Sequence, residues 1–419
     1  MRPIKIILDF FQKKRYEVYD SGLTSVSSVV LSLLITKAIG FNEFGIFAIL
    51  IIIYLYLNQI ISSLTITPLR VFFYSEKVIL RVIYLSSTFY FYLILTVASA
   101  IFFYKAPIST YNLIGLNQLP ENISTFFSLY IVFEAIHSIL KQTLTLLRKF
   151  YYAFLVNLLT QMLKLSLLIY FLIRGQLTLE YVLLTFIASS LPSIFITSYF
   201  LFKNKYLALN PNLSESLSCF IKSANYGIYN LAAVSSLFFS SNYVLILISM
   251  QIGSYYVGII KLIQNIFSVM HPIYALINNI EISSLSSYFN DRYNFHRYAK
   301  KIFIQYNVIN SILLAALIIP ISIFLHYYDN SLYSDFPYLI VGFFVIYLIM
   351  PNVYLYNIYL LADQKKALYL TTIILTSLFI FCISGTLVAR FSVNSIIISY
   401  FIGYAFQLIS FFYYRKRSA

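Results

Sequence analysis

The segment that decides the fold is Lys37–Phe47, KAIGFNEFGIF, a polar turn between two long apolar runs. These runs, residues 20–39 and 44–66, are each long enough to cross a hydrocarbon core of about 30 Å as a helix. The segment therefore predicts a transmembrane helical hairpin.

The hairpin pattern recurs in the second half of the chain. Residues 252–259 read IGSYYVGI and match residues 39–46, which read IGFNEFGI, at both isoleucines and both glycines. A recurrence of this kind is typical of a chain built from two related halves. An even number of spans separates the two copies, so we expect the halves to be parallel repeats.

The composition places the whole chain in the membrane. Of its 419 residues, 60% are hydrophobic and only 10% are charged, which one aqueous core cannot accommodate. Apolar runs bounded by charged or turn residues predict twelve spans, at residues 20–39, 44–66, 82–104, 122–142, 150–173, 179–202, 222–247, 254–279, 302–326, 336–361, 367–389 and 393–414.

The predicted fold is an all-α polytopic membrane protein with twelve transmembrane helices, in two parallel-repeat six-helix lobes around a central cavity. The N-terminal lobe is residues 1–204, preceded at its start by a short interfacial helix. Residues 205–221 are a predicted cytoplasmic linker, and residues 222–419 form the C-terminal lobe.

The positive charge sets the orientation. Most of the 29 Lys and Arg residues fall in alternate loops, while Lys105, Arg174 and Arg390 fall in the others. The rule that cytoplasmic loops are basic places both termini in the cytoplasm of a multi-pass protein. The net charge of +15 then reflects topology, so nucleic acid is not an expected partner.

Ionisable side chains are rare in the spans, and because inserting one costs about 2.5 to 3.5 kcal/mol, they are functional candidates. Lys37, Lys164 and Lys261 fall within spans and are the predicted cationic groups of the cavity, suited to an anionic headgroup. Glu134 and His137 share one face of the fourth span. They are candidates for coupling, with protons or sodium as the candidate ions.

Amide side chains at helical spacing on the same spans are predicted to give the cavity a polar lining. They suit sugar hydroxyls through hydrogen bonds. The set is Asn58, Asn157, Gln161, Asn230, Gln264 and Asn265.

Each ionisable group also has a structural interpretation. Lys37 and Lys261 lie near helix ends, where a long side chain can extend to the lipid headgroups. Glu134 can form a self-neutralising pair with His137, or with Lys164 of the next span. Both interpretations stay open at this point.

The motifs argue against an enzyme. No glycine is followed by lysine, so the phosphate-binding loop of P-loop ATPases is absent from the sequence. No H-E-x-x-H or C-x-x-C motif occurs, and Cys219 and Cys382 fall in different predicted environments. We expect no cofactor and no metal site.

Two stretches carry a family resemblance. Residues 33–49, LLITKAIGFNEFGIFAI, and residues 223–270 resemble the first hairpin and the seventh and eighth helices of O-antigen-type polysaccharide flippases. These form the polysaccharide transporter branch of the multidrug/oligosaccharidyl-lipid/polysaccharide exporter superfamily. The positions that match are Lys37, Gly40, Glu43, Gly45 and Gly258, whereas Asn242 stands where relatives commonly have an acid.

The resemblance implies a function. A member would move an undecaprenyl-pyrophosphate-linked oligosaccharide, an O-antigen or similar repeat unit, from the cytoplasmic to the periplasmic leaflet of a bacterial inner membrane by alternating access. A polysaccharide polymerase and a chain-length regulator are implied partners, beside membrane lipids. From the polar stripes on the spans, and not from the resemblance, we expect Lys164 and Lys261 to hold the pyrophosphate, with Lys37 at the outer exit.

Three alternatives remain. A cation-coupled multidrug exporter of the same superfamily is expected to have an acidic or aromatic cavity, and a lipid II flippase is expected to have further C-terminal spans. A membrane polysaccharide polymerase is the alternative of another class, but the longest predicted outer loop, residues 105–121, is short for one.

Overall fold

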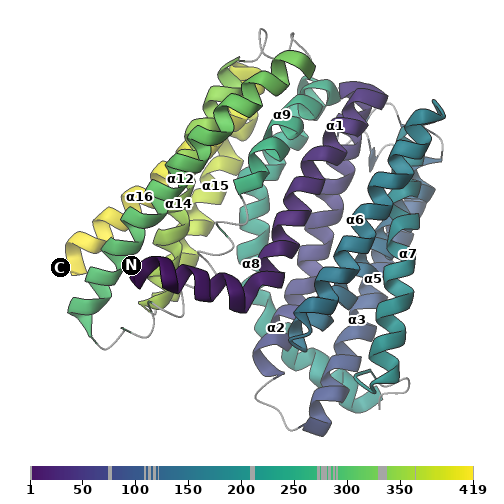
Figure 1. The fold of residues 1–419 in the computed structure, drawn as a ribbon, viewed down its shortest axis with the longest axis horizontal. Helices are drawn as coiled ribbons and strands as arrows, with labels where there is room; N and C mark the ends of the chain where they lie inside the picture. Colours follow the sequence, from purple (N-terminus) through teal and green to yellow (C-terminus); the bar gives the residue numbers. More distant parts are fainter. Residues whose placement is uncertain are drawn as a thin grey trace. The chain divides into compact units, whose positions relative to one another are not determined.

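The computed structural model describes the chain almost throughout, and every regular element in the described residues is a helix (Figure 1). The residues described are 2–73, 78–107, 110–111, 115–116, 119–120, 122–207, 213–270, 274, 281, 285, 288, 291–328, 337–363 and 365–418. The chain divides into two compact units, Met1–Ser235 and Ser236–Ala419, which are described separately below.

The first unit is built from long apolar helices. They are α1 (Arg2–Leu64), α2 (Ile66–Phe72), α3 (Val78–Lys105), α5 (Ile123–Leu146), α6 (Phe150–Ile173), α7 (Leu179–Lys203) and the first part of α8 (Leu213–Gln251). In the core of this unit, α5 packs against α3 on one side and α7 on the other, and α6 packs against α1.

Helix α1 contains the predicted hairpin. Its 63 residues would span about 95 Å if straight, three times the thickness of a hydrocarbon core. The chain instead turns back at Gly40, whose φ of +79° is accessible to glycine without steric cost. The two arms of α1 correspond to the first two predicted spans.

The second unit begins within α8 and continues through α9 (Ser254–Phe267), η1 (Ser268–Met270), α12 (Arg292–Tyr328), α14 (Pro337–Ala362), α15 (Lys366–Phe391), η3 (Ser392–Asn394) and α16 (Ser395–Ser418). Gly253, just before α9, also has a positive φ, +131°. The two glycines that the repeat aligned, Gly40 and Gly253, therefore both mark a reversal of the chain.

The predicted fold class is confirmed as an all-α polytopic membrane fold. Over the described residues, each predicted span coincides with a helix or with one arm of α1, so the count of twelve fits. Seven stretches meet length and hydropathy criteria for crossing a membrane, and two of them, Tyr19–Leu64 and Ala367–Tyr414, are long enough to cross twice.

Helix ends differ from the predicted span ends. Helix α1 starts at Arg2, so the predicted interfacial helix is continuous with the first span, and α12 starts at Arg292, ten residues before the predicted span. The predicted linker, 205–221, is helical from Leu213 onward. Hydropathy locates the part of a helix that lies in hydrocarbon, but Ser, Lys and Glu extend helices beyond it. The lobe limits stay a prediction, while the two compact units divide at Ser235.

One close contact fixes α8 in the first unit. A Cβ at Gly227 would lie 2.3 Å from the carbonyl oxygen of Ser63 in α1, so only glycine allows this approach. The two cysteines form no disulfide. Cys219 is half-buried on α8 in the first unit, and Cys382 is exposed on α15 in the second.

Candidate functional site

The candidate site is a network of charged and amide side chains inside the first unit. It starts from one face of α5, where Glu134, His137 and Lys141 are spaced by three and four residues. Helix α5 packs against α3, α6 and α7, and His137 is buried there, while Glu134 and Lys141 are half-buried. Each of the three finds a polar partner.

The pair at the centre joins α5 to α6. The Lys164 ammonium lies 3.5 Å from the Glu134 carboxylate, and Lys164 is only 4% exposed. The same ammonium lies 4.4 Å from the ring centroid of Phe186 on α7, a cation–π contact. The structure thus realises the pairing of Glu134 with Lys164, the structural alternative that the sequence left open.

His137 connects α5 to α7. Its Nδ1 lies 2.9 Å from the hydroxyl oxygen of Ser193, and His137 is 6% exposed. Ser193 also accepts a hydrogen bond of 3.0 Å from the Thr160 hydroxyl of α6. The imidazole is therefore held by a neutral hydroxyl relay between three helices, and does not form the alternative pair with Glu134 among the interactions of the described residues.

Asp20 on α1 completes the network, and sequence reasoning did not select it. Its carboxylate lies 2.8 Å from the Lys141 ammonium. It also accepts a hydrogen bond of 2.6 Å from Nδ2 of Asn157 on α6, which in turn accepts one of 3.2 Å from Gln161. Asp20 stands where the predicted interfacial helix meets the first span, and a carboxylate at a span end is ordinarily explained by contact with water and headgroups. The signal was that Lys141 continues the α5 stripe and needs a counter-charge.

Phenols surround the central carboxylate. The Glu134 charge acts on Tyr54, Tyr92 and Tyr130. Tyr54 and Tyr130 make an edge-to-face contact with centroids 5.0 Å apart, while the Tyr92 hydroxyl donates a hydrogen bond to Asn58. Asn58 is therefore engaged within the first unit.

The other predicted site residues lie elsewhere. Lys37 is exposed on the first arm of α1, three residues before the Gly40 turn. Asn230 of α8 donates a hydrogen bond of 2.9 Å to the Ser63 hydroxyl. On α9 in the second unit, Lys261 and Asn265 are half-buried, while Gln264 is buried and bonds to Tyr400. The structure thus groups Glu134, His137, Asn157, Gln161 and Lys164, and a cavity between lobes that would include Lys261 stays a prediction.

The second unit holds a different kind of polar interior. Asn307 of α12 and Asn352 of α14 exchange two amide hydrogen bonds, of 2.7 and 3.0 Å. Buried Glu281 accepts hydrogen bonds from the hydroxyls of Tyr298 and Tyr306, at 2.9 and 3.0 Å. Asp363, also buried, accepts a hydrogen bond of 2.7 Å from the Tyr414 hydroxyl.

Chemically, the network of the first unit can hold and exchange charge. Its two carboxylates, Glu134 and Asp20, are each balanced by one lysine in a low-dielectric setting. Protonation of Glu134 would leave the buried Lys164 ammonium unbalanced, whereas Lys141 is partly exposed. Such a network responds to a proton or to an added anion, and it connects α1, α5, α6 and α7.

Comparisons with known proteins bear on the fold. No protein-family model matches the sequence, and no curated protein does so. Among solved structures, the chain is similar to the lipid II flippase MurJ in an inward closed conformation, with a TM-score of 0.71 and 13% identity over 92% of this chain and 85% of that one.

Two further structures cover nearly the whole of both chains. An inward-facing multidrug resistance MATE transporter of the MOP superfamily matches with a TM-score of 0.61 and 14% identity, over 96% of this chain and 94% of that one. A MOP superfamily transporter from Pyrococcus furiosus, described as having a binding pocket of reversed polarity, matches with a TM-score of 0.56, at 14% identity and the same coverage. The chain therefore has the fold of the MOP superfamily transporters.

Proposed function

We propose that this protein is a transporter that moves a lipid-linked anionic glycan, an undecaprenyl-pyrophosphate-linked oligosaccharide such as an O-antigen repeat unit, between the leaflets of a bacterial inner membrane. The observation that carries the proposal is the buried Lys164–Glu134 pair inside a MOP-type fold. A pyrophosphate and several sugars cannot enter hydrocarbon without a polar path, because each buried polar group without a partner costs several kcal/mol.

The pair links anion binding to protonation. Ionised Glu134 balances Lys164, so the lysine is not open to a second anion. Once Glu134 binds a proton, the buried ammonium requires another counter-charge, and a pyrophosphate supplies it. A proton on Glu134 and an anion on Lys164 therefore favour each other, and the coupling is reciprocal. In this scheme Lys164 keeps its predicted contact with the substrate, and Glu134 is the coupling group.

Lys37 and Lys261 complete the proposed anion path. Among the described residues neither of them forms an ion pair, in contrast to Lys164 and Lys141. Lys261 is half-buried on α9, and Lys37 is exposed beside the turn that the charge pattern places at the outer face. Each offers an ammonium without a carboxylate to displace. Partnership with a polymerase and a chain-length regulator stays a prediction from the resemblance.

A cation-coupled multidrug exporter is the second candidate. It is favoured by the similarity to the MATE transporter and by the phenols of Tyr54, Tyr92 and Tyr130 around Glu134, since a carboxylate among aromatic rings suits an organic cation. The structures similar to this chain are transporters, so the fold lends no support to the polymerase alternative.

The test is transport by the purified full chain in proteoliposomes. One arm measures how fast a fluorescent undecaprenyl-pyrophosphate-linked sugar leaves the leaflet that an impermeant quencher reaches, with and without a pH gradient. The other arm measures ethidium efflux under the same gradient. Lys261→Gln is expected to slow lipid movement about tenfold, because a hydrogen bond to a charged group contributes about 1.5 to 3 kcal/mol.

Lys105→Gln is the matched control, since Lys105 is exposed at the end of α3 in the first unit. It should leave the rate unchanged. Lipid movement equal to that of protein-free vesicles, together with gradient-driven ethidium efflux, would replace the flippase by the exporter. Equal rates for Lys261→Gln, Lys37→Gln and wild type would remove the proposed anion path.

A further inference from the structure

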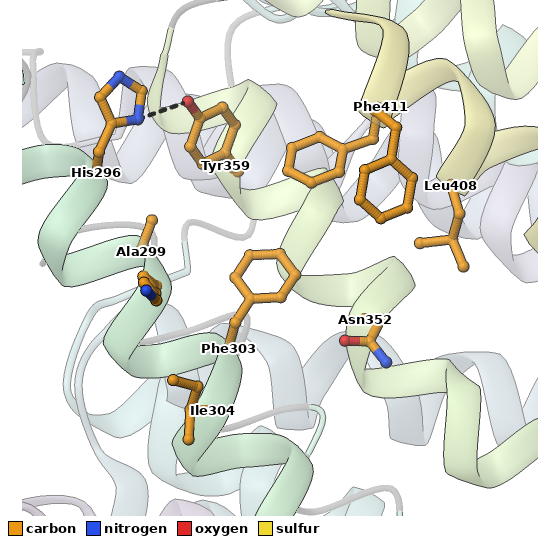
Figure 2. A pocket seen from close by; sticks show the side chains of 10 residues that line it. His296, Ala299, Phe303, Ile304, Asn352, Tyr359, Leu408 and Phe411 are labelled. Carbon is orange, nitrogen blue, oxygen red and sulfur yellow. Dashed lines mark hydrogen bonds between the residues drawn. The ribbon is translucent and has the colours of Figure 1, made fainter. Parts of the chain in front are cut away.

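A pocket of about 390 Å³ opens in the second unit between α12, α14 and α16. Its volume lies within the range of about 300 to 1,000 Å³ found for small-molecule sites. Figure 2 shows the rings of Phe303, Tyr359 and Phe411, one from each of the three helices, around the same space. The pocket is separate from the charged network of the first unit and uses none of the predicted site residues.

Aromatic and aliphatic side chains form most of the pocket wall. Phe411 is 4% exposed and stacks on Phe303, with ring centroids 6.0 Å apart and planes 8° from parallel. Tyr359 packs edge-to-face against Phe411, with ring centroids 5.4 Å apart. At the mouth, Ile304 and Phe412 are 57% and 63% exposed. An apolar wall between the helices of a membrane protein suits a hydrocarbon chain.

One edge of the pocket is cationic. Lys300 lines it and is exposed, and His296 lines it with its Nδ1 3.1 Å from the Tyr359 hydroxyl (Figure 2). Arg297 and Lys301 are exposed on the same stretch of α12 but are not among the residues that line the pocket. Among the described residues no carboxylate forms an ion pair with Lys300. The edge therefore carries positive charge that an anion would balance.

The charged edge and the apolar wall lie at different depths. Helix α12 has 37 residues and is about 56 Å long, well over the roughly 30 Å of a hydrocarbon core. The predicted apolar span begins at residue 302, so His296 and Lys300 precede it, at headgroup level. Ile304 and Phe303 fall within it. The pocket thus straddles the boundary between headgroups and acyl chains.

We propose that this pocket binds an anionic phospholipid, with its phosphate at Lys300 and one acyl chain against Phe303, Phe411 and Phe412. Basic pockets between transmembrane helices on the cytoplasmic side bind anionic headgroups, and the charge pattern places this end of α12 in the cytoplasm. Both the sign of the edge and the depth of the wall fit this one occupant. The site does not depend on which substrate the protein transports.

Native mass spectrometry of the detergent-solubilised full chain tests the site. Phosphatidylglycerol and phosphatidylcholine are titrated separately, and the dissociation constant of the first bound lipid is measured. Wild type should bind phosphatidylglycerol more tightly. Lys300→Gln should weaken phosphatidylglycerol binding about fivefold and leave phosphatidylcholine unchanged, because one basic residue near an anionic surface contributes about that factor.

Lys301→Gln is the matched control, since it removes the same charge one residue away from a side chain that lines the pocket. It should bind like wild type. Ala299→Leu narrows the pocket at a buried lining position and should weaken both lipids, while Phe412→Ala, at an exposed position, tests the wall without a folding risk. Equal losses in Lys300→Gln and Lys301→Gln, or no loss in Phe412→Ala, would overturn the proposal and leave only nonspecific attraction.

Discussion

The helices of the two units are joined in their interiors by different kinds of polar contact. In the first unit, α1, α5 and α6 are joined by ion pairs, Asp20 with Lys141 and Glu134 with Lys164. In the described part of the second unit, α12 and α14 are joined by the neutral amide pair of Asn307 and Asn352. A neutral pair has one protonation state at physiological pH, whereas an ion pair can be broken by a proton. The two units therefore differ in how these helices are joined, by charged side chains in the first and by neutral amides between α12 and α14 in the second.

Removing one charge from the pair of Glu134 and Lys164 should have the largest effect on stability among the changes that test this comparison. Glu134→Gln leaves the Lys164 ammonium buried without a counter-charge, so we expect the free energy of unfolding to fall by about 3 to 5 kcal/mol. The double variant Glu134→Gln/Lys164→Met should recover most of that loss. Thermal unfolding of wild type, Glu134→Gln, Lys164→Met and the double variant in detergent gives the double-mutant cycle. Additive losses would show that the two side chains are not coupled, and Glu43→Gln, at an exposed position, is the control.

Packing provides the next test. Gly227→Ala in the first unit would place a Cβ 2.3 Å from the Ser63 carbonyl oxygen, so α8 must move away from α1. We expect a loss of about 3 kcal/mol in unfolding free energy, the upper end of the usual cost of overpacking. Gly385→Ala on α15 of the second unit is the control, because no atom lies within 4 Å of its Cβ position. It should be neutral or stabilising, and equal losses at both glycines would contradict the close approach.

The neutral pair should show a smaller effect. Asn352→Leu leaves the Asn307 amide without its partner and is expected to cost about 1 to 3 kcal/mol. The double variant Asn307→Leu/Asn352→Leu should be nearly as stable as wild type, because both polar groups are then absent. This loss should be the same at pH 6 and pH 8 in thermal unfolding, because neither amide titrates. A pH-dependent loss would contradict the assignment of the effect to the amide pair.

The smallest effect is expected at the start of α12. The backbone N–H of Asn294 donates a hydrogen bond to Asp291, and this bond lowers the pKa of the exposed carboxyl from its ordinary value. A lowered pKa in the folded state means that stability is gained above the unfolded pKa, about 3.9, and is lost as the pH falls through the folded one. Asp291→Asn should therefore flatten the acid limb of the melting temperature against pH. If the melting temperature falls equally steeply at acid pH in Asp291→Asn and in wild type, the loss of stability comes from other carboxyl groups.

Much of the fold could be predicted from the sequence, because hydrophobic length is a local property. Over the described residues, every predicted span coincides with a helix or with one arm of α1, and the aligned Gly40 and Gly253 both adopt the positive φ that a reversal requires. The ends were missed at Arg2, Leu213 and Arg292 because polar residues continue a helix outside hydrocarbon without leaving a hydropathy signal.

The site was predicted in part. The periodicity of Glu134 and His137 on α5 showed that they share a face, and the pairing of Glu134 with Lys164 was one of the alternatives that the sequence left open. The contact of His137 with Ser193 was not predicted, since partners on other helices depend on packing. Asp20 was missed because a carboxylate at a span end has the same sequence signature as a loop residue. The pocket beside Lys300 was missed because its aromatic wall looks like ordinary core in a chain with 39 Phe and 40 Tyr.

The two cysteines have a practical consequence. Cys219 lies on the first unit and Cys382 on the second, and neither is in a disulfide. The chain thus carries one thiol on each unit, half-buried on α8 and exposed on α15. A donor dye and an acceptor dye attached there would report the separation of the halves by energy transfer, without any engineered attachment point. If substrate or acid changes the separation of the two units, the ratio of donor to acceptor fluorescence of the labelled sample will change.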